Sequence, residues 1–234
     1  MLSFQGMAQP DRPYGSTFHL FNYRQNSPAI LDAAIMESLK IGEGSIEWVY
    51  PIAGETRPEF TGLSFLQLDP QQRAAWEEFW PQSGTAPSWD AVARVSSAGI
   101  WLLIEAKANH PELCSSPCGA KARASLDVIE RSLAETKASL GVHRFYRWEG
   151  TYYQYANRLA LLHFLQKIGV ATHLVFLYFS GDRFPDETPC PDSPASWKEL
   201  IHACHMTLGL PDQHRLSPWI HDVFLPVSAP EGDV

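Results

Sequence analysis

Two strand-like segments separated by four small or polar residues constrain the fold of this chain more than any other feature. The segments cover residues 89–95 and 100–108, and Ser96-Ser97-Ala98-Gly99 joins them. A short connection with a glycine between two such runs is typical of a β-hairpin. A turn of two or four residues centred on this connection gives the same pairing, in which Asp90 lies directly opposite Glu105. A turn of odd length would shift Asp90 to a diagonal position.

The side chains of the second segment divide between two faces, because successive residues of a strand point to opposite sides. Glu105 and Lys107 therefore share one face, and the even-length turn brings Asp90 to them. Directly opposed residues have Cβ atoms roughly 5 Å apart, so two opposed carboxylates destabilise a sheet unless a cation lies between them. Mg²⁺ or Mn²⁺ suits that position, since both prefer carboxylate oxygens and retain bound water. Lys107 would then hold an attacking water or neutralise charge on a phosphate.

The remaining segments predict an α/β domain with a mixed sheet. Ser27 followed by Pro28 is a favourable helix start. The predicted helices cover residues 27–40, 70–80, 120–140, 152–168 and 196–208, and the predicted strands outside the hairpin cover 45–52, 172–179 and 221–227. This order predicts one domain over residues 27–234, with a central sheet flanked by helices. Residues 1–26 are expected to form an N-terminal arm, of which residues 1–6 resemble a tag or an upstream extension.

Overall composition restricts the class of protein. The chain has 234 residues, of which 45% are hydrophobic, enough to bury a substantial core. Its formal net charge of -8 provides no global basic field, which argues against a protein that coats DNA but leaves room for an enzyme with a local basic rim. Four cysteines, no segment like a signal peptide and no apolar run of about 20 residues favour a cytoplasmic protein with reduced thiols and no membrane contact.

The order of elements and acids resembles the PD-(D/E)xK nuclease superfamily, which has a restriction-endonuclease-like αβββαβ core. In that family the first acid opens the second strand and an acid-x-Lys triplet lies on the third, which Ser88-Trp89-Asp90 and Glu105-Ala106-Lys107 match without the usual proline. The resemblance covers residues 27–180. It implies catalytic roles for both acids and the lysine, a bound Mg²⁺ or Mn²⁺, DNA more than RNA as substrate, and often a homodimer. Many members carry a further metal-binding acid on the first helix, for which Glu37 is the best match.

Four further residues are candidates for contact with nucleic acid. Members of the family that resemble RecB carry Gln-x-x-x-Tyr on the helix after the triplet, and here Gln154 is present while Arg158 replaces the tyrosine. Arg158 would contact phosphate. Arg147 belongs to a basic and aromatic segment, and Lys121 begins the helix after the triplet. The alternative for Arg147 is a loop packed on the sheet, and the alternative for Lys121 is a solvated helix face.

Alternatives to a metal-dependent nuclease remain open. One is a non-catalytic module of the same fold, an accessory of a DNA-processing or defence system, which the acidic net charge and Arg158 favour. Another is an unrelated α/β enzyme in which the Glu-x-Lys pattern is incidental. A zinc site is a third candidate, but its spacings differ from the short pairs of structural zinc sites. Its residues would be His110, Cys114, Cys118, His202, Cys204 and His205.

Overall fold

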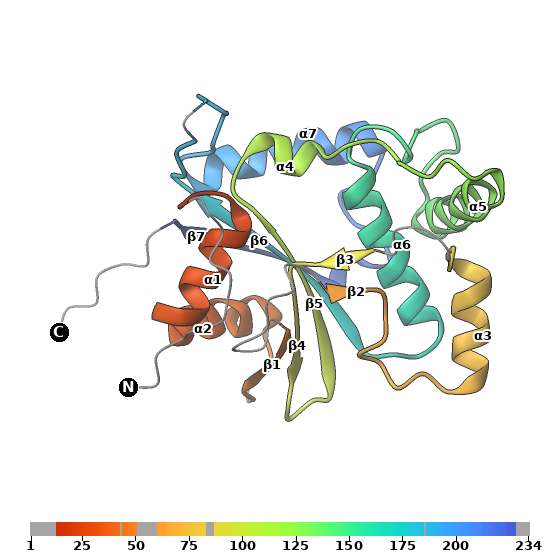
Figure 1. The fold of residues 1–234 in the computed structure, drawn as a ribbon, viewed down its shortest axis with the longest axis horizontal. Coiled ribbons are helices and arrows are strands. Elements are labelled where there is room, and N and C mark those ends of the chain that lie inside the picture. The colour runs from red at the N-terminus through yellow and green to blue at the C-terminus, as the bar shows by residue number, and fades with distance from the viewer. Residues whose placement is uncertain (1–12, 43, 51–59, 83–86, 185, 228–234) are drawn as a thin grey trace.

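The chain forms an α/β structure on a five-stranded mixed sheet in a computed structural model that describes residues 13–42, 44–50, 60–82, 87–184 and 186–227 (Figure 1). The strand order is β1-β4-β5-β6-β7. These strands are β1 (Ile46–Tyr50), β4 (Ala91–Val95), β5 (Ile100–Lys107), β6 (Thr172–Ser180) and β7 (Ile220–Pro226). A separate two-stranded sheet pairs β2 (Phe60–Thr61) with β3 (Ser88–Trp89).

The directions of the strands follow from their connections. β1 pairs antiparallel with β4, and β4 with β5, whereas β5, β6 and β7 run parallel. Parallel neighbours need a long crossover. Helices α4 (His110–Cys114), α5 (Arg123–Leu140) and α6 (Tyr153–Lys167) lie between β5 and β6, and α7 (Pro194–Leu208) and the short 3-10 helix η1 (Ser217–Trp219) lie between β6 and β7. The α/β class with a mixed sheet is therefore confirmed.

Helices cover both faces of the sheet. α1 (Ser16–Asn26) and α2 (Pro28–Leu39) pack on one face, while α6 and α7 pack on the other, with α5 and α3 (Pro70–Phe79) beside α6 (Figure 1). A strand buried on both faces is apolar throughout rather than alternating. This explains the run Leu102-Leu103-Ile104 in β5, each residue of which is fully buried. Polar side chains near the end of such a strand are therefore enclosed by protein.

The hairpin has the register expected from an even-length turn. Ala91 pairs with Ile104 and Val95 pairs with Ile100. Val92 and Leu103 belong to the core beneath α6, whereas Ala91 and Ile104 belong to the core beneath α1 and α2. The alternation predicted for β5 is therefore confirmed, and Glu105 and Lys107 face α6.

Several boundaries differ from expectation. The N-terminal arm expected over residues 1–26 is wrong for residues 16–26, which form α1 and bury Leu20 and Tyr23, while residues 1–12 lie outside the described part. α1 carries few apolar residues among many polar ones, so its sequence gives a weak helical pattern. α5 begins at Arg123 rather than at residue 120, and α7 begins at Pro194 rather than at residue 196, with Ser193 as its capping residue. The short elements α4, β2 and β3 were not expected.

Candidate active site

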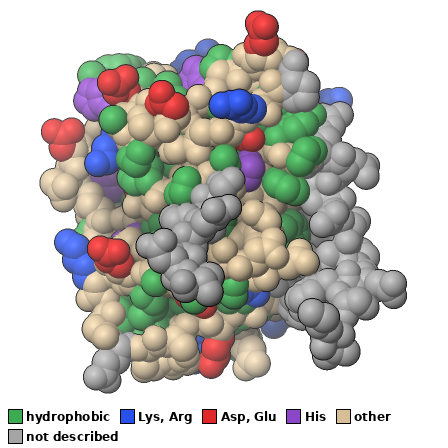
Figure 2. Space-filling view, turned by 90° about the vertical axis from the view of Figure 1, so that its left-hand side faces the viewer, with side chains coloured by type: hydrophobic (Ala, Val, Ile, Leu, Met, Phe, Trp, Pro, Cys, Tyr) green, Lys and Arg blue, Asp and Glu red, His purple; other side chains and the backbone are tan. Residues whose placement is uncertain are grey.

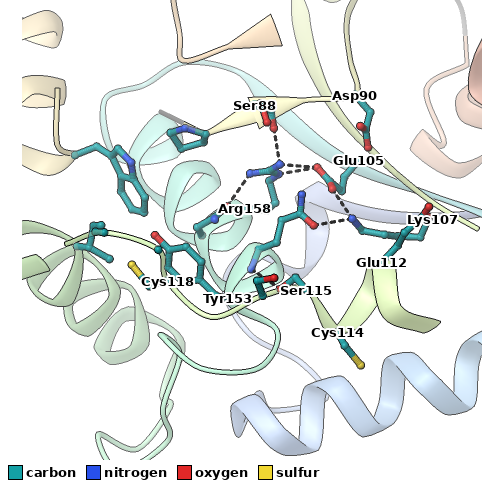
Figure 3. Close-up of a pocket in the computed structure, with 18 of the residues that line it drawn as sticks. Ser88, Asp90, Glu105, Lys107, Glu112, Cys114, Ser115, Cys118, Tyr153 and Arg158 are labelled. Atoms are coloured by element: carbon teal, nitrogen blue, oxygen red, sulfur yellow. Dashed lines mark hydrogen bonds and ion pairs between the residues drawn. The ribbon is translucent and has the colours of Figure 1, made fainter. Parts of the chain in front are cut away.

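A cavity of about 990 Å³ lies between the end of β5 and the helices α4, α5 and α6 (Figure 3). Six of the eight residues expected in a site line it. They are Asp90, Glu105, Lys107, Lys121, Gln154 and Arg158. They come from the hairpin, from the segment before α5 and from the first two turns of α6. Residues distant in the sequence therefore meet at one place.

The hairpin positions both acids. Asp90 immediately precedes the Ala91–Ile104 pair, so it continues the register toward Glu105. Its Oδ2 accepts a hydrogen bond of 2.7 Å from the backbone N–H of Ala106, which ties the carboxyl group to the neighbouring strand. Figure 3 shows Asp90 and Glu105 directed into the same cavity. The sheet thus brings two carboxyl groups together, as the turn length predicts.

Two cations surround Glu105. Lys107 Nζ donates to Glu105 Oε1 at 2.6 Å, and Arg158 donates to Oε2 from Nε at 2.8 Å. Arg158 Nη2 lies 2.7 Å from the same oxygen. Glu105 is 1% exposed, Arg158 2% and Lys107 6%, so this is a buried ion network rather than a surface pair. Such a network is stabilising only if its charges and hydrogen-bonding groups are all matched.

The α6 side chains hold the two cations in place. Gln154 Oε1 accepts a hydrogen bond of 2.7 Å from Lys107 Nζ. Arg158 donates from Nη1 to Asn157 Oδ1 at 2.7 Å and from Nη2 to the backbone carbonyl of Ser88. Gln154 and Arg158 are four residues apart, so they lie on one side of the helix. The Gln-x-x-x-Arg spacing therefore presents both side chains to the acid-x-Lys strand.

The electrostatics of the two acids differ. Burial, together with repulsion by Glu105, raises the pKa of Asp90 to about 7. Burial would by itself raise the pKa of Glu105, but Arg158 and Lys107 outweigh it and hold that pKa below its usual value. Of these two acids, Glu105 is therefore ionised at neutral pH, whereas Asp90 is near the midpoint of its titration. Paired acids with separated pKa values are common at functional sites.

Glu112 is a third carboxylate of the cavity that was not identified from sequence. Its Oε2 accepts a hydrogen bond of 2.7 Å from the backbone N–H of Ala108, and its Oε1 accepts one of 3.3 Å from Ser16. Asn109 Oδ1 accepts from the Glu112 backbone N–H and so caps α4. The Asn-His-Pro-Glu string is a helix-start signal that could have revealed this turn. Glu112 thereby joins the end of β5 to the start of α1.

Two expected site residues lie elsewhere. Glu37 is exposed on α2, which covers the opposite face of the sheet, so it does not reach the cavity. Arg147 is also outside it: its side chain is 80% exposed and pairs with Glu149 at 3.0 Å. Glu37 was expected from the family resemblance and Arg147 from its basic and aromatic segment, and only tertiary packing decides where a helix or loop lies relative to the sheet. Lys121 does line the cavity and is exposed, as a solvated rim residue would be.

The cysteines and histidines give no support to the zinc alternative. Cys114 Sγ lies 3.1 Å from His110 Nε2, and all four cysteines are free. Within the described ranges, no group of three or more His, Cys, Asp or Glu side chains is placed to hold a metal ion. Cys114 and Cys118 line the cavity without forming such a cluster.

Comparisons with known proteins give no family. No family model, no curated protein and no solved structure matches this chain. Among the residues that the structure describes, no helix has the length and apolar character needed to span a membrane. Arguments about function therefore depend on the geometry of the cavity.

Proposed function

We propose that this chain is a divalent-metal-dependent phosphodiesterase of the PD-(D/E)xK type, which hydrolyses nucleic acid and prefers DNA to RNA. The observation that carries the proposal is the convergence of Asp90, Glu105 and Lys107 on one cavity. The order α2, β1, β4, β5, α6 and β6 supports a restriction-endonuclease-like core. Gln154 and Arg158 on α6 contact Lys107 and Glu105, with Arg158 in the place of the tyrosine of the RecB-like members.

Asp90 and Glu105 offer the oxygen donors that a hard divalent ion prefers, while no group of three such side chains is placed to hold a metal ion among the described residues. Mg²⁺ is usually held by one or two carboxylates, water and substrate phosphates rather than by a full protein cage. Asp90 and Glu105 supply two carboxylates, and Glu112 lines the same cavity. Repulsion between Asp90 and Glu105 is one cause of the raised pKa of Asp90, and a cation between the two would relieve it. When bound, the ion would polarise a phosphate oxygen and lower the pKa of the attacking water.

Lys107 is the residue best placed to act on the reacting phosphate. Glu105 and Gln154 hold its ammonium group from two directions, so its position in the cavity is fixed. A fixed positive charge stabilises the charge that develops on a phosphate during attack. The positive charge of Lys107 and Arg158 is confined to the cavity and does not extend over the whole surface. On the face shown in Figure 2, acidic and basic side chains are interspersed, in line with the net charge of -8.

Cleavage assays test this proposal. We expect the purified chain to cut single-stranded, duplex or branched DNA when Mg²⁺ or Mn²⁺ is present and to stop when the ion is chelated. Asp90→Asn and Lys107→Met should each lower the rate about a hundredfold or more. Glu37→Gln is the matched control, because Glu37 is an exposed acid on the other face of the sheet, and its rate should not change. No cleavage of any DNA or RNA substrate with either ion would contradict the proposal.

A non-catalytic interaction module is the second candidate, and one observation favours it. Both oxygens of Glu105 already have cationic partners in Lys107 and Arg158. An acid neutralised by its own protein is compatible with a fold that has lost its metal ion. Calorimetry separates the candidates: the absence of Mg²⁺ and Mn²⁺ binding at millimolar concentration, with and without DNA, supports the module.

A further inference from the structure

Arg158 occupies the side of Glu105 where the proposed function requires a divalent ion. Its Nε and Nη2 both approach one carboxylate oxygen, Oε2, at 2.8 and 2.7 Å. Lys107 Nζ donates to the other oxygen, Oε1, at 2.6 Å. A metal ion that binds Glu105 must therefore compete with one of these two cations.

Arg158 is better able than Lys107 to release Glu105. Its guanidinium also donates to Asn157 Oδ1 and to the carbonyl of Ser88, and its Cζ lies 4.6 Å from the centre of the Trp89 ring. These contacts can persist when Glu105 is released. The guanidinium then keeps two acceptors and an aromatic face, so its charge is not left without partners.

The edge of Arg158 that Glu105 occupies is also suited to a phosphate. Nε and Nη2 form the planar fork that binds carboxylates and phosphates alike. Arg158 and Glu105 both line the cavity, and Figure 3 shows the guanidinium between Ser88 and the Glu105 carboxylate. A phosphodiester that enters the cavity thus competes with Glu105 for the same donors.

The charges favour an exchange in which metal and phosphate arrive together. A divalent ion that approaches Glu105 alone is repelled by both Arg158 and Lys107. A phosphate that approaches Arg158 alone removes a cation from the buried Glu105 carboxylate. When both bind, the ion pairs with the carboxylate and the phosphate pairs with the guanidinium, so that every buried charge has a partner again.

We propose that Arg158 is an internal counter-ion that couples metal binding to substrate binding. It neutralises Glu105 in the empty site and transfers to a substrate phosphate when the divalent ion takes its place. This inference rests on the proposed function and makes Arg158 a positioning residue that sets when the ion binds. Because coupling between two ligands is reciprocal, the phosphate must tighten metal binding by the same factor as the metal tightens phosphate binding.

The test is calorimetric titration of the full chain with Mn²⁺, with and without a phosphorothioate-linked oligothymidine, in which sulfur slows cleavage. In the unaltered chain the oligonucleotide should tighten Mn²⁺ binding about tenfold or more. A methylphosphonate-linked oligothymidine lacks the anionic oxygen and should give no such effect. Arg158→Gln should bind Mn²⁺ about tenfold more tightly without oligonucleotide and lose most of the coupling. Arg147→Gln removes one exposed positive charge outside the cavity and should resemble the unaltered chain.

The outcomes separate this inference from the proposed function. If the unaltered chain binds Mn²⁺ and cleaves DNA, but its Mn²⁺ affinity is the same with both oligonucleotides, the counter-ion role is wrong and the proposed function stands. If no protein binds Mn²⁺ at millimolar concentration under any of these conditions, both are wrong. The comparison of the two oligonucleotides uses the unaltered chain, so it tests the coupling of metal and phosphate binding even if Arg158→Gln does not fold.

Discussion

Arg158 Nη2 lies 2.7 Å from Glu105 Oε2, and both side chains are almost completely buried between β5 and α6. The pair joins the strand that carries the acid-x-Lys triplet to the helix that covers it. Lys107, on the other oxygen of Glu105, adds a second link through Gln154. The same contacts therefore link β5 to α6 and set the charge of the cavity around Glu105.

Neutralising Glu105 should destabilise the chain. Glu105→Gln keeps the size of the side chain but leaves two buried cations without their shared anion. Removing one partner of a buried pair typically costs about 3–5 kcal/mol of unfolding free energy. Urea unfolding measures this value, with Glu37→Gln as the exposed control, expected within about 0.5 kcal/mol of the unaltered chain. Equal stability of the two variants would mean that the ion network does not stabilise the fold.

Asp90 should make stability depend on pH. Its pKa is raised from 3.8 to about 7, so the folded chain binds this proton more tightly than the unfolded chain. Stability must then fall as pH rises through that interval, on the order of a few kcal/mol. The Asp90→Asn variant has no carboxyl group to ionise at this position, so this contribution to the fall in unfolding free energy should be missing. Urea unfolding between about pH 4 and pH 7.5 measures both proteins. Parallel pH profiles would show that the pKa of Asp90 is not raised.

Gln154 should affect the rate of cleavage more than metal binding. Gln154→Leu removes the Oε1 acceptor of Lys107 Nζ but leaves Glu105 in place. Misplacing a catalytic group by about 1 Å lowers rates by up to about a hundredfold. We expect a fall of about tenfold or more in kcat with an unchanged Mn²⁺ affinity in calorimetry. A loss of Mn²⁺ affinity with an unchanged kcat would contradict this role.

A stacked histidine pair should make the fold sensitive to acid. His173 Nδ1 lies 2.8 Å from His221 Nε2, and His221 Nδ1 lies 2.9 Å from the carbonyl oxygen of Ser38. Burial lowers the pKa of His173 to about 4 and also lowers the pKa of His221, with Lys40 adding to the effect on His221. The folded chain then binds fewer protons than the unfolded chain, so stability is lost as pH falls below 6.5 toward about 4.

His173→Gln tests this pair, because glutamine cannot become protonated and still offers a hydrogen bond to His221. Thermal unfolding between about pH 7 and pH 4 should show a smaller loss of Tm for the variant than for the unaltered chain. The same loss of Tm in both proteins would exclude the pair as a source of acid sensitivity.

The parts of this structure that the sequence predicts depend on local rules. The four-residue connection fixes the register, and alternation then brings Asp90, Glu105 and Lys107 to one face. The spacing of Gln154 and Arg158 places both on one side of α6. These inferences need only the periods of a strand and a helix.

The remaining features depend on packing between distant segments. Glu37 has a suitable position in the sequence, but α2 covers the other face of the sheet. Glu112 enters the cavity through the α4 cap, which Asn109 forms after the strand ends. Strand geometry indicated that a cation must lie near two opposed acids, and in this structure Lys107 and Arg158 fill that role. No local pattern shows that Arg158, on a helix joined to α5 by residues 141–152, reaches Glu105.

Anomalous diffraction from a crystal grown with Mn²⁺ and a phosphorothioate oligothymidine tests the central claim most directly. The account predicts a Mn²⁺ peak coordinated by carboxylate oxygens of Asp90 and Glu105, with Arg158 moved from Glu105 to a phosphate. A crystal with bound oligonucleotide, no Mn²⁺ at these carboxylates and the Arg158–Glu105 ion pair intact would contradict it.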